Sequence, residues 1–214
     1  MQTPDSIFES SLIPKKCRYL LAIDEVGRGP WAGPLHMAGC LFDLKHFNCN
    51  LLAKHPIRDS KLLSASQRNK LVHGILKEIP TIITYKDNNY IDKYGLALAI
   101  KTLVDEISNS FSQVDFLLID GNYHLDNSLP YKSIIKGDRR CFTIASASII
   151  AKVERDRVMD EHALLYPQYG FDKHKGYGTV QHLVALKKYG PCPIHRRSFK
   201  PLHAFLLSPQ IHHY

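Results

Sequence analysis

The chain has 214 residues, of which 44% are hydrophobic and 22% charged, and its formal net charge is +8. This composition is ordinary for a globular protein, and no apolar run approaches the ~20 residues of a membrane span, so membrane insertion is not expected. No linker or internal repeat divides the chain, which predicts a single domain over residues 1–214. The first residues lack the pattern of a signal or transit peptide, which predicts a cytoplasmic protein.

The positive charge is concentrated in one segment. Residues 132–200 hold 14 Lys and Arg against 6 Asp and Glu, while the rest of the chain balances. Such clustering suits a phosphate-rich partner, although a solvated basic face is an equal alternative on charge alone. The five cysteines are odd in number and form no CxxC pair, which predicts packing roles rather than disulfides or a zinc cluster.

Hydrophobic runs and turn residues predict alternating strands and helices. Short apolar runs predict strands at residues 18–24, 35–42, 81–86, 116–120 and 131–136. Apolar residues at helical spacing predict helices at 64–79, 91–111, 145–158 and 179–189, with a further helix near the C-terminus. Ser64 and Gln67 form a capping-box pattern at the first of these helices. The order predicts an α/β domain with a mixed sheet.

Acidic residues stand at the ends of two predicted strands. Asp24 and Asp120 each close an apolar run, and Asp138 follows in "IIKGDRRC". Ligands bind at strand ends in open α/β sheets, so these carboxylates would converge. Their mutual repulsion would be removed by a divalent cation, and oxygen ligands favour Mg²⁺ or Mn²⁺. Two such ions suit phosphodiester hydrolysis. For each aspartate alone, capping a turn is the commoner role.

Glycines flank two further candidate binding sites. In "GRG", Gly27 and Gly29 allow close backbone approach or a positive φ, and Arg28 adds charge, although an ordinary tight turn is the alternative. Tyr177 lies between two glycines in "HKGYGT", where its ring could stack on a sugar or base, or simply be buried in a loop. The residues His174, His182 and His195 are interpreted as surface or packing residues rather than ligands.

Six segments in order resemble bacterial ribonuclease HII over about residues 19–200: "AIDEVGRGPWAGP", "DSKLLS", "LLIDGN", "KGDRRCFTIASASIIAKVERDR", "YPQYGFDKHKGYGT" and "GPCPIHRRSF". The GRG favours this family over the related ribonuclease HIII, which has a different glycine motif after its Asp-Glu pair. The resemblance implies an α/β ribonuclease H-like fold with a central mixed five-stranded sheet flanked by helices, and a helical C-terminal segment at about 179–214.

The resemblance also implies a site and an activity. The family's four metal-binding and catalytic acids fall on Asp24, Glu25, Asp120 and Asp138, with Mg²⁺ or Mn²⁺ as cofactor. The implied enzyme cuts the RNA strand of RNA/DNA hybrids. It also nicks duplex DNA 5′ to a single embedded ribonucleotide, leaving 3′-hydroxyl and 5′-phosphate ends.

The resemblance also implies the residues that recognise ribose. The loop Gly27, Arg28 and Gly29 would bind the 2′-hydroxyl, and Tyr177 would pack on the following sugar. One departure is "RRCFT" after Asp138, where smaller or less basic residues are expected. Arg139 and Arg140 would add phosphate contacts there and alter affinity without changing the cut.

Two other functions stay open at this point. A non-catalytic module could grip hybrids with the basic segment and keep the carboxylates as structural groups. A junction resolvase of the same fold would not need a 2′-hydroxyl. The partners expected are RNA/DNA hybrid and ribonucleotide-containing duplex DNA, without a membrane. The protein is expected to act as a monomer, and the sequence does not decide whether a sliding clamp recruits it.

Overall fold

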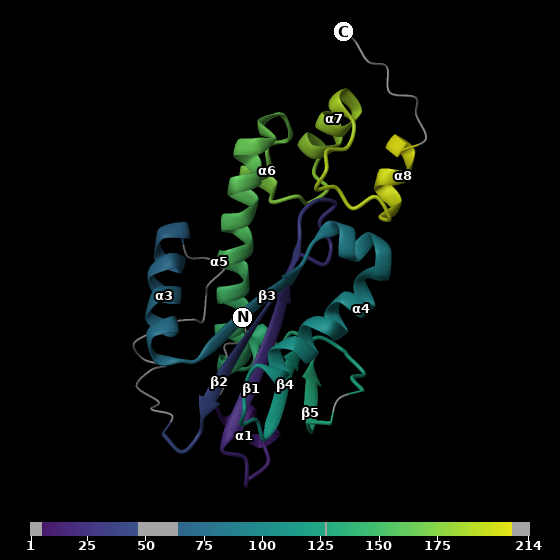
Figure 1. The fold of residues 1–214 in the computed structure, drawn as a ribbon. Helices are drawn as coiled ribbons and strands as arrows, with labels where there is room; N and C mark the ends of the chain where they lie inside the picture. The colour runs from purple at the N-terminus through teal and green to yellow at the C-terminus, as the bar shows by residue number, and fades with distance from the viewer. Residues whose placement is uncertain (1–5, 47–63, 127, 207–214) are drawn as a thin grey trace. The chain divides into compact units, whose positions relative to one another are not determined.

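The computed structural model describes residues 6–46, 64–126 and 128–206, and these form two compact units (Figure 1). Unit 1 comprises residues 1–26, 36–84 and 101–153, and unit 2 comprises residues 27–35, 85–100 and 154–214. The expectation of one domain over residues 1–214 stays a prediction.

A five-stranded sheet is the centre of unit 1, with strand order β3-β2-β1-β4-β5. β1 pairs antiparallel with β2 and parallel with β4, and β4 pairs parallel with β5, so the sheet is mixed, as predicted. The strands are β1 (Tyr19–Val26), β2 (Leu35–Asp43), β3 (Thr81–Lys86), β4 (Phe116–Asp120) and β5 (Tyr131–Ile134).

The sheet is buried on both faces, which explains why β1 and β4 read as continuous apolar runs. One face packs against α3 (Ala65–Glu78) and the first half of α5 (Phe142–Leu165). The other face packs against the second half of α4 (Asn88–Asn109), where Gly39 of β2 has no room for a Cβ beside the Ile107 side chain. Figure 1 shows α3 and α4 on opposite sides of the strands.

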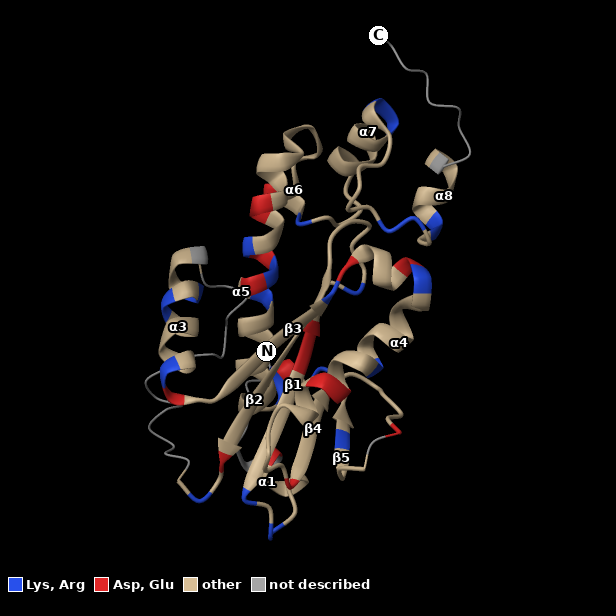
Figure 2. Ribbon diagram, viewed as in Figure 1, with Lys and Arg blue, Asp and Glu red and all other residues tan. Residues whose placement is uncertain are grey.

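The helix ends follow local chemistry. The capping box at α3 is confirmed, because the Ser64 amide donates to Gln67 Oε1 at 2.9 Å and the Gln67 amide donates to Ser64 Oγ at 3.3 Å. α4 begins three residues before the predicted start, and Gly95 interrupts it with φ 81° and ψ 161°. α5 also begins three residues earlier than predicted, and its second half carries the charged residues (Figure 2). A short helix, α1 (Ser6–Leu12), was not predicted.

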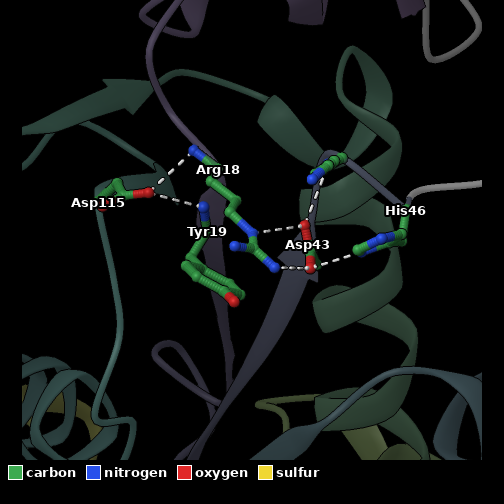
Figure 3. Close-up of polar contacts among 6 residues, drawn as sticks. Arg18, Tyr19, Asp43, His46 and Asp115 are labelled. Atoms are coloured by element: carbon green, nitrogen blue, oxygen red, sulfur yellow. Dashed lines mark hydrogen bonds and ion pairs between the residues drawn. The ribbon is translucent and has the colours of Figure 1, made fainter.

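Side chains fix β1 between its neighbours at its N-terminal end (Figure 3). The Asp115 carboxylate accepts from the amides of Arg18 and Tyr19, both at 2.8 Å. The Arg18 guanidinium donates to Asp43 at the end of β2, and His46 also bonds that carboxylate. The bond from Arg18, followed by that from His46, lowers the pKa of Asp43, and the two amide bonds lower that of Asp115. These contacts set the register of the sheet at the opposite end of β1 from Asp24.

Unit 2 has its own small core around the second half of α5. The predicted helical C-terminal segment is confirmed within the described residues, and residues 207–214 lie outside them. The elements of unit 2 beyond α5 are a 3₁₀ turn (Pro167–Tyr169), α6 (Phe171–His174), α7 (Val180–Tyr189) and α8 (Lys200–Leu206).

Buried histidines tie the loops of unit 2 together. His182 Nε2 lies 3.0 Å from His195 Nε2. The rings of His174 and His182 are stacked, with their centroids 4.6 Å apart. Burial lowers the pKa of His182 and of His195 to about 4, so both rings are neutral at physiological pH. All three side chains pack inside the unit, as the sequence interpretation allowed. The described cysteines (Cys17, Cys40, Cys141 and Cys192) are free, as predicted, and Cys49 lies outside the described residues. No described helix is long and apolar enough to cross a membrane.

Candidate active site

Asp24 and Asp120 converge, as expected for two aspartates near the ends of neighbouring strands. The parallel register of β1 and β4 pairs Ile23 with Ile119, so each aspartate is the next residue along its strand. Alternation along the strands places both on the face that packs against α5, because Ala22 and Leu118 belong to the core that α5 completes. Two carboxylates are thus brought to the same face of adjacent strands.

Asp24 is the buried member of the group, with 4% of its surface exposed. The Glu25 amide donates to its Oδ1 at 2.7 Å, and the Ser148 hydroxyl of α5 also bonds the carboxylate. Burial, followed by the negative charges of Glu25 and Asp120, raises the pKa of Asp24 well above its usual range. A nearby positive charge would favour ionisation of this carboxyl group.

Glu25 is oriented by a tyrosine that the sequence analysis did not identify. The hydroxyl of Tyr123 donates to Glu25 Oε1 at 2.8 Å. Ser133 of β5 holds this tyrosine by bonding its amide at 3.2 Å and its carbonyl at 2.9 Å. Gly121, at φ 111°, permits the turn, because a Cβ there would lie 2.6 Å from the Tyr123 ring.

The loop that carries Asp138 is attached to Asp120. The Gly137 amide donates to Asp120 Oδ1 at 2.7 Å, and Gly137 starts the 3₁₀ turn Gly137–Arg139. A Cβ at Gly137 would lie 2.6 Å from Ile144, so glycine lets this turn approach the sheet. The bond places the Asp138 turn next to the Asp120 carboxylate, and Asp138 itself is half-buried. Of its basic neighbours, Arg139 is exposed and Arg140 half-buried.

The carboxylate oxygens of these acids are suitable ligands for a divalent cation, although they do not form a complete cage. In the described part of the chain, no group of three or more His, Cys, Asp or Glu side chains is placed to enclose a metal ion. Mg²⁺ typically binds through one or two carboxylates, several waters and a substrate phosphate, so a complete protein cage is not required. The oxygen-only donors match that mode.

The GRG loop lies in unit 2, where buried side chains hold its backbone. Gly27 has φ 99°, and a Cβ there would lie 2.7 Å from the Pro34 carbonyl oxygen. Arg155 donates to that carbonyl at 2.9 Å, and Arg196 donates to the Arg28 carbonyl at 3.1 Å. Position 27 therefore requires glycine. Hydrogen bonds from the buried Arg155 and Arg196 side chains to main-chain carbonyls fix the conformation of the loop.

Tyr177 lies beside the same loop. A Cβ on Gly29 would be 3.9 Å from Tyr177 Cε1, so the GRG loop and the ring are neighbours. The ring is 41% exposed, which contradicts the alternative of a buried loop tyrosine. The Tyr177 carbonyl bonds His182 Nδ1 at 2.9 Å, and Gly178 has no room for a Cβ beside the Trp31 ring. The structure brings the predicted recognition residues together within unit 2.

Residues 59–63 of the "DSKLLS" segment lie outside the described residues. The acids of unit 1 and the recognition loop of unit 2 are joined by the chain itself, since Gly27 follows Glu25 by two residues. The residues that sequence reasoning missed are buried or half-buried polar side chains without a motif-like spacing: Glu9, Tyr123, Ser148, Arg155 and Arg196.

Comparison with known proteins adds independent evidence. The sequence model of the family described as Ribonuclease HII matches residues 21–202. The Ribonuclease HII of Caldicellulosiruptor saccharolyticus is 40% identical over 196 residues, which cover 89% of this chain and 91% of that protein.

Solved structures share the fold. The crystal structure of the ribonuclease H2 from Pyrococcus horikoshii OT3 matches with a TM-score of 0.75 at 24% identity, over 87% of this chain and 96% of that one. The crystal structure of Bst-RNase HIII in complex with Mn²⁺ matches with a TM-score of 0.65 at 17% identity, over 88% of this chain and 69% of that one. These likenesses place the mixed sheet and its helices in the ribonuclease H fold.

Proposed function

Because the chain belongs to the ribonuclease HII family and is a ribonuclease H enzyme, we propose that Asp24, Glu25, Asp120 and Asp138 form its metal-dependent hydrolytic centre. The family cleaves the RNA strand of RNA/DNA hybrids and cuts duplexes at embedded ribonucleotides. We further propose that the cut lies 5′ to the ribonucleotide and leaves 3′-hydroxyl and 5′-phosphate ends. The observation that carries the proposal is the convergence of Asp24 and Asp120 on one face of adjacent strands, with Glu25 next in the chain and the Asp138 turn bonded to Asp120.

Mg²⁺ or Mn²⁺ would be held by these carboxylates, and two ions with substrate bound would supply an activated water and a stabilised leaving oxygen. The donor chemistry supports this assignment, and the Mn²⁺ complex of the structurally similar ribonuclease HIII supports it by analogy. Asp24 and Asp120, on adjacent strands, would share the ions, and Glu25 and Asp138 would complete the set.

The residues of the chain have distinct tasks around that centre. The Tyr123 hydroxyl holds Glu25 in one orientation, and the Ser148 hydroxyl and the Glu25 amide hold Asp24. The Gly137 amide keeps the Asp138 turn against Asp120. These contacts limit the movement of the carboxylates before substrate binds, which reduces the reorganisation that the reaction requires.

Substrate recognition is proposed for the other unit. Backbone groups of Gly27–Gly29 would read the 2′-hydroxyl, which both donates and accepts hydrogen bonds and alone distinguishes RNA from DNA. The exposed Tyr177 ring would pack on the following sugar. Arg139 and Arg140 would add phosphate contacts. Action as a monomer and a cytoplasmic location stay predictions.

A labelled DNA duplex with one ribonucleotide tests the function against an all-DNA control, in Mg²⁺, Mn²⁺ or EDTA. The expected result is one metal-dependent nick 5′ to the ribonucleotide in the first duplex only. Binding without cutting would favour the non-catalytic module, and cutting of the all-DNA duplex would favour a nuclease that ignores the 2′-hydroxyl. Asp24→Asn should strongly reduce turnover, whereas the exposed control Asp172→Asn should not change it.

A further inference from the structure

Two fully buried arginines lie under the GRG loop in unit 2. Arg155 and Arg196 each have 0% of their surface exposed. Arg155 donates to the carbonyl oxygens of Pro34 at 2.9 Å, Lys175 at 3.0 Å and Ala32 at 3.2 Å. Arg196 donates to the carbonyl oxygens of Gly33 at 2.9 Å and Arg28 at 3.1 Å. Four of these five carbonyls belong to the segment 28–34, which contains most of the GRG motif.

Burying these two guanidinium groups in a core carries a large desolvation free energy. Neither forms an ion pair with a carboxylate within the described residues. Burial lowers the pKa of Arg155 to about 10, and burial together with the charge of Arg155 lowers that of Arg196 to about 9. Both remain cationic at physiological pH. Arg196 Nη2 is also buried without a hydrogen-bond partner in the described structure. Burying two cations without a carboxylate partner costs desolvation free energy, and what they hold in return is main chain of the segment 28–34.

We propose that Arg155 and Arg196 are positioning residues that preset the segment 28–34 for recognition of the ribose 2′-hydroxyl. The inference rests on the function proposed above for the GRG loop. It explains why both side chains end on main-chain oxygens: five donors on a rigid plane can hold several carbonyls at once, which a lysine ammonium cannot do in the same geometry.

Main-chain bonds complete the restraint of this segment. The Trp31 amide donates to the Gly176 carbonyl at 2.8 Å, and the Gly33 amide donates to the Ile194 carbonyl at 2.9 Å. The Arg196 amide donates to the Trp31 carbonyl at 2.8 Å, so Arg196 binds the segment through both its main chain and its side chain.

The same arginines reach the second recognition element. Arg155 holds the Lys175 carbonyl, two residues before Tyr177, and its guanidinium carbon lies 5.9 Å from the centre of the Tyr177 ring. Asp92 in turn fixes the chain next to Arg196, because it accepts from the amides of Arg197 and Ser198, each at 2.9 Å. The same buried arginines therefore hold both the GRG loop and the segment that carries the Tyr177 ring.

Lysine substitutions test the proposal, because they keep the positive charge and remove the fork of donors. Arg155→Lys and Arg196→Lys are compared with Arg157→Lys, an exposed site on the same helix whose partners are Glu154 and Glu161. The measurement is the Kd of the full-length protein, in EDTA, for a duplex with one ribonucleotide and for the matched all-DNA duplex. In each buried variant, the Kd for the all-DNA duplex divided by the Kd for the ribonucleotide duplex should fall about fivefold or more. The all-DNA Kd itself should stay nearly unchanged. The control should keep the wild-type ratio.

Hydrogen exchange provides a measurement that does not depend on a folded variant. In the free wild-type protein, the amides of Trp31 and Gly33 should already be protected, since the segment is preset. Exchange at the rate of an unstructured chain, with protection only after the ribonucleotide duplex binds, would overturn the proposal.

The outcomes separate this inference from the function on which it rests. A wild type that binds both duplexes equally would overturn the assignment of the GRG loop, and the positioning role with it. Wild-type discrimination that survives in folded Arg155→Lys and Arg196→Lys would overturn the positioning role alone.

Discussion

The hydroxyl of Tyr123 donates a 2.8 Å hydrogen bond to Oε1 of Glu25. The two residues are 98 positions apart, and the bond joins the loop after β4 to the end of β1. A carboxylate held by a neutral donor keeps its charge for a metal ion while its orientation is fixed.

Tyr123→Phe removes only this donor. It should lower kcat about 3- to 10-fold, because one hydrogen bond contributes about 0.5–1.5 kcal/mol, and should leave the melting temperature nearly unchanged. Steady-state cleavage of the single-ribonucleotide duplex measures the effect, with the exposed Tyr94→Phe as control. Unchanged kcat in Tyr123→Phe would show that Glu25 does not need this orientation.

Glu9 of α1 caps the N-terminus of α5. Its carboxylate accepts from the amides of Phe142 at 2.9 Å and Thr143 at 3.2 Å, and from the Thr143 hydroxyl. Glu9→Ala should lower stability by about 1–2 kcal/mol because these donors lose their partner. Thermal melting should show a fall of about 2–8 °C. The exposed Glu161→Ala is the control, and equal melting temperatures for the two variants would contradict the capping role.

Asp115 gives a prediction on acid stability. The amides of Tyr19 and Arg18 lower its pKa, so its folded-state pKa lies below the unfolded value of about 3.9. Its stabilising contribution is therefore present above about pH 4 and is lost as the pH falls through the folded pKa. Asp115→Asn should melt a few degrees below wild type at neutral pH, and the difference should shrink in acid. A difference that grows in acid would contradict this account.

Tyr177→Ala should affect recognition more than folding, because the ring is 41% exposed. The expected change is about a tenfold loss of kcat/KM on the single-ribonucleotide duplex, since stacking on an aromatic ring contributes about 1–3 kcal/mol. Tyr189→Ala is a matched control, being 49% exposed and also close to a cation, Lys188. An equal loss on every substrate with a lower melting temperature would make Tyr177 a structural residue instead.

The parts of the fold that the sequence predicted are those with a strong local signal. Apolar runs located all five strands of the described sheet, and Ser64 with Gln67 located the start of α3. The convergence of Asp24 and Asp120 followed from the position of each at the end of its strand. α1 was missed because seven residues show too little periodicity, and the first three residues of α4 were missed because they begin with two polar asparagines and extend no apolar pattern.

Contacts between distant segments were not predictable in the same way. Tyr123 lies in an irregular loop, and only the folded chain brings it to Glu25. Arg155 and Arg196 counted among the 14 basic residues of the segment 132–200, yet both are buried and hold backbone carbonyls. Net charge gives no information on which cations are exposed, so these two functional candidates required the structure.

In the proposed mechanism the acids around Asp24 need a divalent cation, and the melting temperature measured as a function of pH reports on that need. Burial and the neighbouring charges raise the folded-state pKa of Asp24 above its unfolded value, so the metal-free protein loses stability as the pH rises between the two. Asp24→Asn lacks this loss.

In EDTA, wild type should melt progressively below Asp24→Asn as the pH rises above the unfolded-state pKa of about 3.9. Excess Mg²⁺ should raise the melting temperature of wild type, because binding to the folded state stabilises it, and should raise that of the variant much less. A wild type that melts above the variant in EDTA at the highest pH and does not respond to Mg²⁺ or Mn²⁺ would contradict the account.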